Sequence, residues 1–107
     1  MDKKRVIEAL KEVYDPEIPI NIYDLGLVYD VLVENGKIKV VMTMTAPGCP
    51  MAYYVVKMVE DRLRKLENVE DVEVELTWDP PWSPDKATEE GKKKLRELFP
   101  WLFEKKE

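Results

Sequence analysis

Residues 27–44 have the sequence LVYDVLVENGKIKVVMTM, and this stretch decides the fold. Apolar residues occupy every second position on both sides of Asn35-Gly36, which is the spacing of strands that bury one face. The alternating set is Leu27, Tyr29, Val31 and Val33 before the dipeptide and Ile38, Val40, Met42 and Met44 after it. Because Asn-Gly supplies the positive φ angles of a tight turn, the stretch predicts a β-hairpin.

On the carboxyl side of the hairpin, Pro47 and Gly48 end the second strand and the period of the sequence changes. Apolar side chains recur at helical spacing over residues 51–66, and they alternate with polar ones over residues 72–78, ending at Trp78. A strand, a helix and a further strand form a crossover unit, in which the last strand runs parallel to a hairpin strand.

On the amino side, the apolar spacing of residues 3–14 predicts an amphipathic helix that Asp15-Pro16 ends. Near the carboxyl end, Thr88 followed by Glu89 and Glu90 is typical of an N-cap and an acidic first turn. We therefore expect an α+β domain of α-β-β-α-β order, with a mixed sheet of three or four strands, helices on one face and a C-terminal helix. Residues 1–107 should be a single domain, with a core of residues 3–79, a Pro-rich loop 79–87, and a helix and tail 88–107.

Composition narrows the class of function. The chain has 107 residues, a net charge of −5 and no basic stripe, so we expect no nucleic-acid partner. It lacks a long apolar run, so we expect no membrane association, and a single cysteine agrees with a reducing, cytoplasmic setting. Histidine is absent, which removes the commonest general base, and abundant Lys and Glu without Gln are typical of heat-adapted proteins.

The single cysteine, Cys49, lies in the segment Thr-Ala-Pro-Gly-Cys-Pro of residues 45–50, at the predicted strand-to-helix junction. Pro50 suits the first helical position, which makes Cys49 the N-cap and favours its thiolate. The alternative is that Cys49 is a small buried apolar side chain. One cysteine without histidine cannot hold a permanent iron-sulfur cluster, so any metal ligation by Cys49 would be transient and would need ligands from a partner.

Two further segments could take part in a site. Asp15, Glu17 and Asp24 lie in a Pro-containing loop, where such acids also commonly satisfy nearby backbone amides. Residues 78–82 could form the wall of a pocket or a recognition surface, and they are Trp78, Asp79, Pro80, Pro81 and Trp82. The apolar residues 98–103 either pack on the body, which we expect, or are displayed to a subunit.

Four segments in order resemble the SufT/PaaD-like family of iron-sulfur cluster assembly factors. They are residues 15–19, 24–29, 43–50 and 78–82. The resemblance implies a small α/β domain that helps to mature iron-sulfur proteins, and we expect the protein not to be an enzyme. It also implies a reactive cysteine at Cys49, with Asp15, Glu17, Asp24 and Thr45 near it. We expect the neighbours of Cys49 in the chain, Pro47, Gly48 and Pro50, to belong to the same site.

The resemblance implies no permanent cofactor, but a transient iron-sulfur cluster or iron ion. Its partners would be an assembly scaffold or carrier protein and apo-client proteins. A homodimer is a further possibility, since two copies could pair their cysteines. The alternative function is a protein–protein adaptor in which Cys49 is structural. A cysteine-nucleophile enzyme is a weaker interpretation, because no histidine could serve as its base.

Overall fold

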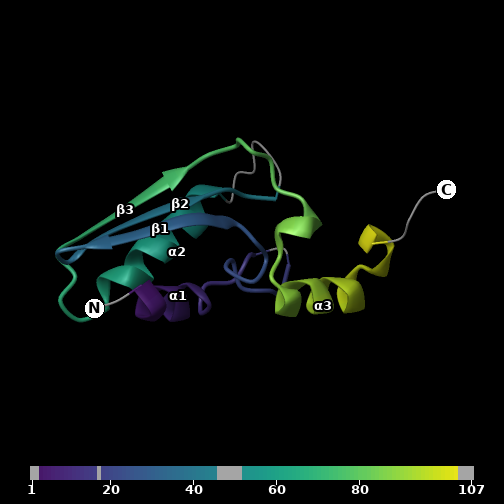
Figure 1. Ribbon diagram of the computed structural model, residues 1–107, viewed down its shortest axis with the longest axis horizontal. Coiled ribbons are helices and arrows are strands. Elements are labelled where there is room, and N and C mark those ends of the chain that lie inside the picture. The colour runs from purple at the N-terminus through teal and green to yellow at the C-terminus, as the bar shows by residue number, and fades with distance from the viewer. Residues whose placement is uncertain (1–2, 17, 46–51, 104–107) are drawn as a thin grey trace.

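The computed structural model describes residues 3–16, 18–45 and 52–103. Within these ranges, three helices and three strands follow one another as α1 (Lys3–Leu10), β1 (Val28–Glu34), β2 (Lys37–Met42), α2 (Ala52–Arg64), β3 (Asp71–Leu76) and α3 (Glu89–Leu98). Short 3-10 turns lie before α3 at Pro84–Lys86 and after it at Pro100–Phe103. Figure 1 shows α1 and α2 on one side of the sheet and α3 beyond its end. The predicted α+β architecture is confirmed.

The sheet has the order β1-β2-β3, with β2 in the centre. β1 and β2 are antiparallel and meet at Asn35-Gly36, whose φ angles are +49° and +80°. β3 runs parallel to β2, from the pair Lys37 and Asp71 to the pair Met42 and Leu76. The hairpin and the parallel crossover strand are thus confirmed, and the described residues form three strands.

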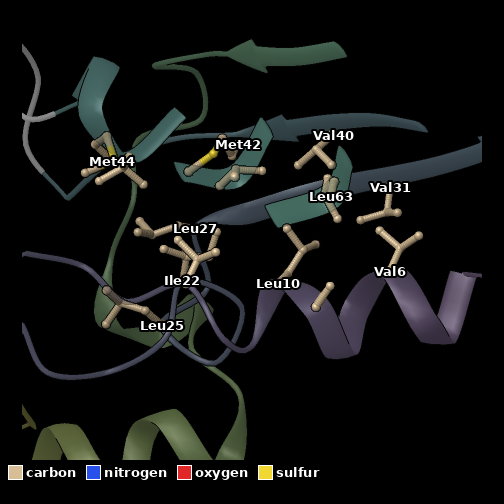
Figure 2. Close-up of a cluster of buried hydrophobic side chains, with 14 of the residues drawn as sticks. Val6, Leu10, Ile22, Leu25, Leu27, Val31, Val40, Met42, Met44 and Leu63 are labelled. Atoms are coloured by element: carbon tan, nitrogen blue, oxygen red, sulfur yellow. The ribbon is translucent and has the colours of Figure 1, made fainter. Parts of the chain in front are cut away.

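The core lies between the inner face of the sheet and the two helices that cover it, and the loop over residues 20–27 extends it (Figure 2). α1 contributes Val6 and Leu10, and α2 contributes Val55, Val59 and Leu63. The largest fully buried side chains include these from the sheet and the loop: Ile20, Ile22, Leu25, Leu27, Ile38, Val40 and Met42. The loop that precedes β1 is therefore a structural part of the core.

The first helix is shorter than the sequence predicts, because α1 ends at Leu10 and not at Tyr14. Residues 12 and 13 make tighter bonds, from Glu12 N to Ala9 O and from Val13 N to Leu10 O. The Val13 carbonyl then accepts from Ile22 N, and Tyr14 forms a bridge with Asn21. Pairing with residues 21 and 22 thus replaces the last helical turn.

Two aromatic residues lie differently from the predicted alternation. Tyr29 is the extra residue of a β-bulge, since Val28 pairs with Met42 while Asp30 pairs with Val41. A bulge changes which face a residue occupies, so Tyr29 lies at the margin of the sheet and is only partly buried. Trp78 lies beyond the end of β3 at Leu76 and is 38% exposed, because the ladder ends where Thr77 N donates to Met42 O.

The last helix begins as predicted, with Thr88 as the N-cap and Glu89 and Glu90 in the first turn. α3 buries Gly91 and Leu95 and ends at Leu98. Within the described parts of the chain, none of the helices combines the length and apolar character that crossing a membrane requires.

Candidate functional site

The carboxyl end of β2 meets the tryptophan segment of residues 78–82. Thr43, Met44 and Thr45 leave β2 and line a small pocket of about 80 Å³ together with Trp78, Pro81 and Trp82. Thr45 is the first residue of the predicted cysteine segment. The structure therefore brings the start of that segment against the predicted recognition surface, although the two are more than 30 residues apart in the chain.

The two tryptophans of this pocket have different roles in the structure. The Trp82 indole Nε1 donates a hydrogen bond of 2.7 Å to the Leu25 carbonyl, and the ring packs partly buried against the core. Trp78 is more exposed, as are Asp79, Pro80 and Pro81. Trp82 thus anchors the segment to the loop before β1, while Trp78 presents its surface to the outside.

Asp24 is a buried carboxylate held by neighbours on both sides. Asn21 Nδ2 donates to Asp24 Oδ2 at 2.7 Å, and Asp24 N donates back to Asn21 Oδ1 at 2.8 Å. From α3, the Thr88 hydroxyl donates to Asp24 Oδ1 at 2.9 Å. The Thr88 amide donates to the Asp24 carbonyl at 2.9 Å. Because the carboxylate oxygens accept these bonds, Asp24 joins the loop to the last helix.

Two glycines allow the loop and the C-terminal segment to come this close. A Cβ atom on Gly91 would lie 1.9 Å from the Asp24 carbonyl oxygen. A Cβ atom on Gly26 would lie 2.4 Å from the Lys86 carbonyl oxygen, and the φ angle of Gly26 is +85°. Neither position can accept a side chain without movement of the backbone.

Asp15 lies in a different place, at the wall of a groove between the end of α1 and α2. It is buried and accepts a hydrogen bond of 3.0 Å from Ile18 N, which confirms the turn-forming interpretation. The groove has a volume of about 560 Å³ and is lined, among others, by Tyr14, Pro16, Tyr54 and Met58. Tyr14 and Tyr54 are both exposed there.

Tyr29 links the sheet to the tryptophan segment. Its hydroxyl donates to the Pro80 carbonyl at 2.7 Å, and the Lys86 ammonium lies 5.3 Å from the ring centroid. Burial, and to a smaller extent the Asp79 carboxylate, raise the pKa of the Tyr29 phenol above its ordinary value of 10.0. The phenol is therefore neutral and a donor at physiological pH.

The remaining predicted site residues, Glu17, Pro47, Gly48, Cys49 and Pro50, lie outside the described residues. Of the predicted acids that are described, Asp15 lines the groove and Asp24 contacts α3, while Thr45 lies at the tryptophan pocket. Among residues 3–16, 18–45 and 52–103, no three Asp, Glu, Cys or His side chains gather in a way that could hold a metal ion.

Sequence reasoning did not identify several residues that shape these sites. Asn21, three residues before Asp24, has the spacing of an Asx-type contact and could have been recognised. Thr88 was identified as an N-cap, but its bond to Asp24 spans 64 residues and left no local signal. Met58 was assigned only to the core stripe of the predicted helix, and Tyr54 was not singled out, although both line the groove beside Asp15.

Comparison with known proteins bears on this arrangement. The family model described as "Iron-sulfur cluster assembly protein" matches residues 3–76. A Bacillus subtilis protein named "Fe-S protein maturation auxiliary factor YitW" is 43% identical over 91 residues, which are 84% of this chain and 89% of that protein. A Porphyromonas gingivalis protein named "Fe-S protein maturation auxiliary factor" is 42% identical over 87 residues, covering 80% and 83% of the two chains.

A solved structure from Thermotoga maritima, described as a conserved hypothetical protein, superposes with a TM-score of 0.78. It is 44% identical, and the match covers 92% of this chain and 94% of that one. The resemblance indicated by the four sequence motifs is confirmed. This chain belongs to the iron-sulfur cluster assembly protein family.

Proposed function

We propose that this protein is a non-catalytic accessory factor in the maturation of iron-sulfur proteins, in which Cys49 contacts a cluster, an iron ion or a client cysteine for a short time. The observation that carries the proposal is the pocket shared by Thr45 with Trp78, Pro81 and Trp82. Two of the four family-like segments meet in it. The same role is supported by relatives that are named maturation auxiliary factors and that this chain matches over most of their length.

The pocket suits a transient contact. Cys49 follows Thr45 by four residues, so it can reach no farther than about 14 Å from this pocket. Trp78 offers an exposed aromatic face beside Thr45, and aromatic side chains are enriched in recognition surfaces. A cluster or iron ion is the cargo in this proposal, and scaffold, carrier or apo-client proteins supply its other ligands.

The setting of the cysteine agrees with this chemistry. A thiolate is the form that binds metal, and a single cysteine among 107 residues can persist as a thiol in a reducing cytoplasm. A partner is needed because one thiolate is too few ligands for a stable cluster. We therefore expect cluster binding that depends on a second protein, a second copy or a small thiol.

A test is the anaerobic loading of wild type and Cys49→Ser with ferrous iron and sulfide in the presence of glutathione. Iron content and visible absorption are measured after desalting, and circular dichroism checks that both proteins are folded. We expect iron and sulfide to remain with wild type only. Equal and negligible loading of both proteins would contradict the carrier role.

The groove beside Asp15 favours a second candidate, a protein–protein adaptor. Exposed Tyr14 and Tyr54 with Met58 form an apolar surface of the kind that anchors a partner chain. An adaptor would tolerate Cys49→Ser, whereas Tyr54→Ala would weaken binding to a client or scaffold. Isothermal titration of both variants with one apo-client separates the two candidates.

A further inference from the structure

The outer face of the sheet is not covered by a helix in the described structure. α1 and α2 pack on the inner face, and α3 lies beyond the end of the sheet (Figure 1). By the strand register, three rows cross the outer face. They are Glu34-Lys37-Asp71, Leu32-Lys39-Glu73 and Asp30-Val41-Glu75.

This outer face is acidic and carries one exposed apolar side chain, Leu32. It carries five carboxylates against two lysines, and Lys39 is already engaged, with Nζ 3.6 Å from both Glu73 and Glu75. Leu32 is 53% exposed and lines a hollow of about 380 Å³ with Glu34, Lys37 and Asp71. The chemistry of the surface therefore suits a basic segment that ends in an apolar side chain.

The C-terminal part of the chain has this complementary chemistry. Residues 92–101 contain four basic residues, Lys92, Lys93, Lys94 and Arg96, and one acidic residue, Glu97. At the end of the same segment Leu98 is 42% exposed and Trp101 is 61% exposed, although the sequence favoured packing of this region. In this segment Leu95 is fully buried and Phe99 packs partly against the core, and the Phe99 ring meets the Trp101 ring edge-on at 5.5 Å.

One chain cannot form this contact with itself. The hairpin turn, next to Glu34 and Asp71, and α3 lie at opposite ends of a molecule whose longest extent is 51 Å (Figure 1). Residues 92–98 of α3 span about 10 Å, and strands of six or seven residues are about 20 Å long, so this part of the helix fits within the length of the open face.

We propose that residues 92–101 of one copy dock on the outer face of the sheet of a second copy. The lysines face the excess carboxylates, and Trp101 with Leu98 covers Leu32. The contact joins two different surfaces, so it gives a closed dimer if it is reciprocal and longer assemblies if it is not. Salt weakens it because its charges are exposed.

The test uses sedimentation velocity of the full chain at low salt, up to about 1 mM protein. Two double variants reverse one surface each: Glu34→Lys with Asp71→Lys, and Lys93→Glu with Lys94→Glu. We expect wild type to associate and each variant alone to associate roughly tenfold more weakly, since like charges then face each other. A one-to-one mixture of the two variants should associate again, because both contacts regain opposite charges.

A matched control, Glu8→Lys with Glu67→Lys, makes the same change in net charge on the helical side, where both residues are exposed. It should associate at least as well as wild type. Trp101→Ala should weaken association without changing charge. A wild-type protein that stays monomeric throughout, or a variant mixture that stays monomeric while wild type associates, overturns the proposal.

Discussion

The hydrogen bonds of Thr88 serve two purposes. Its hydroxyl accepts from Gly91 N at 3.1 Å, which caps α3, and donates to Asp24 Oδ1 at 2.9 Å, which holds the loop before β1. Its amide donates to the Asp24 carbonyl. A single hydroxyl thus satisfies a helix terminus and a buried carboxylate together.

Two substitutions of Thr88 separate the contribution of the hydroxyl to stability from that of side-chain size. Thr88→Val keeps the shape but loses both side-chain bonds, and we expect a loss of about 2 kcal/mol in the free energy of unfolding. Thr88→Ser keeps the hydroxyl and should lose well under half of that. Urea unfolding measures both variants, and equal stability of Thr88→Val and wild type would contradict the role given to this contact.

Tyr29 should make stability depend on alkaline pH. Its folded pKa is raised above 10.0 because burial and Asp79 disfavour the phenolate. The neutral phenol donates to Pro80 O, so its stabilising effect is complete below pH 10 and is lost as the pH rises through the folded pKa.

The variant Tyr29→Phe removes the phenol and with it this pH-dependent contribution to stability. We expect it to be less stable than wild type at pH 7, by about 0.5 kcal/mol for a partly exposed hydrogen bond. The difference should shrink as the pH passes the folded pKa of the phenol. Thermal unfolding of both proteins from pH 7 to pH 11 measures this, and a constant difference would show that the phenol's ionisation is not involved.

At the scale of elements, α3 depends on one close approach to the rest of the fold. Gly91 lies against the Asp24 carbonyl, and Leu95 on the same side of the helix is fully buried. The helix therefore joins the body through a backbone contact that only glycine permits.

Gly91→Ala should show the reverse of the usual helix preference. In an exposed helix this change stabilises by about 1 kcal/mol, because alanine is the better helix former. Here the added methyl group meets backbone, so we expect a net loss of about 2 kcal/mol. Lys93→Ala, at an exposed position of the same helix, should stay within about 0.5 kcal/mol of wild type. Chemical unfolding would contradict the close approach if Gly91→Ala were the more stable protein.

Most elements could be predicted from the sequence because their signals are local. The hairpin with Asn35-Gly36, the helix from Ala52 and the cap at Thr88 each have period or turn chemistry within a few residues. The end of α1 at Leu10 and the exposure of Trp78 depend on pairing with residues 21, 22 and 42, which no local pattern encodes.

The candidate site follows the same division. The tryptophan segment and the residues around Thr45 were identified separately by their composition, and only the fold brings them into one pocket. Asp15 accepts from a nearby backbone amide, as the sequence predicts. The Asp24 carboxylate instead accepts from the side chains of Asn21 and Thr88, and the bond from Thr88 crosses most of the chain. Whether the acids also serve Cys49 stays a prediction.

On the scale of the whole molecule, three of the four family-like segments contact one another at the end of the sheet. They are residues 24–29, the described part of 43–50, and residues 78–82. Trp82 bonds to Leu25, Tyr29 bonds to Pro80, and Thr45 shares its pocket with Trp78 and Trp82. The central claim is that this assembled end presents Cys49 and Trp78 to cargo and client as one working surface.

The rate of cluster transfer tests this claim most directly. Wild type, Cys49→Ser, Trp78→Ala and a control, Lys57→Ala on the exposed side of α2, are loaded with iron and sulfide and mixed with an apo-ferredoxin. Visible circular dichroism then follows formation of the holo-ferredoxin. We expect transfer by wild type and the control, none above background by Cys49→Ser, and about tenfold slower transfer by Trp78→Ala at equal iron content. Equal rates for all four proteins would contradict the account.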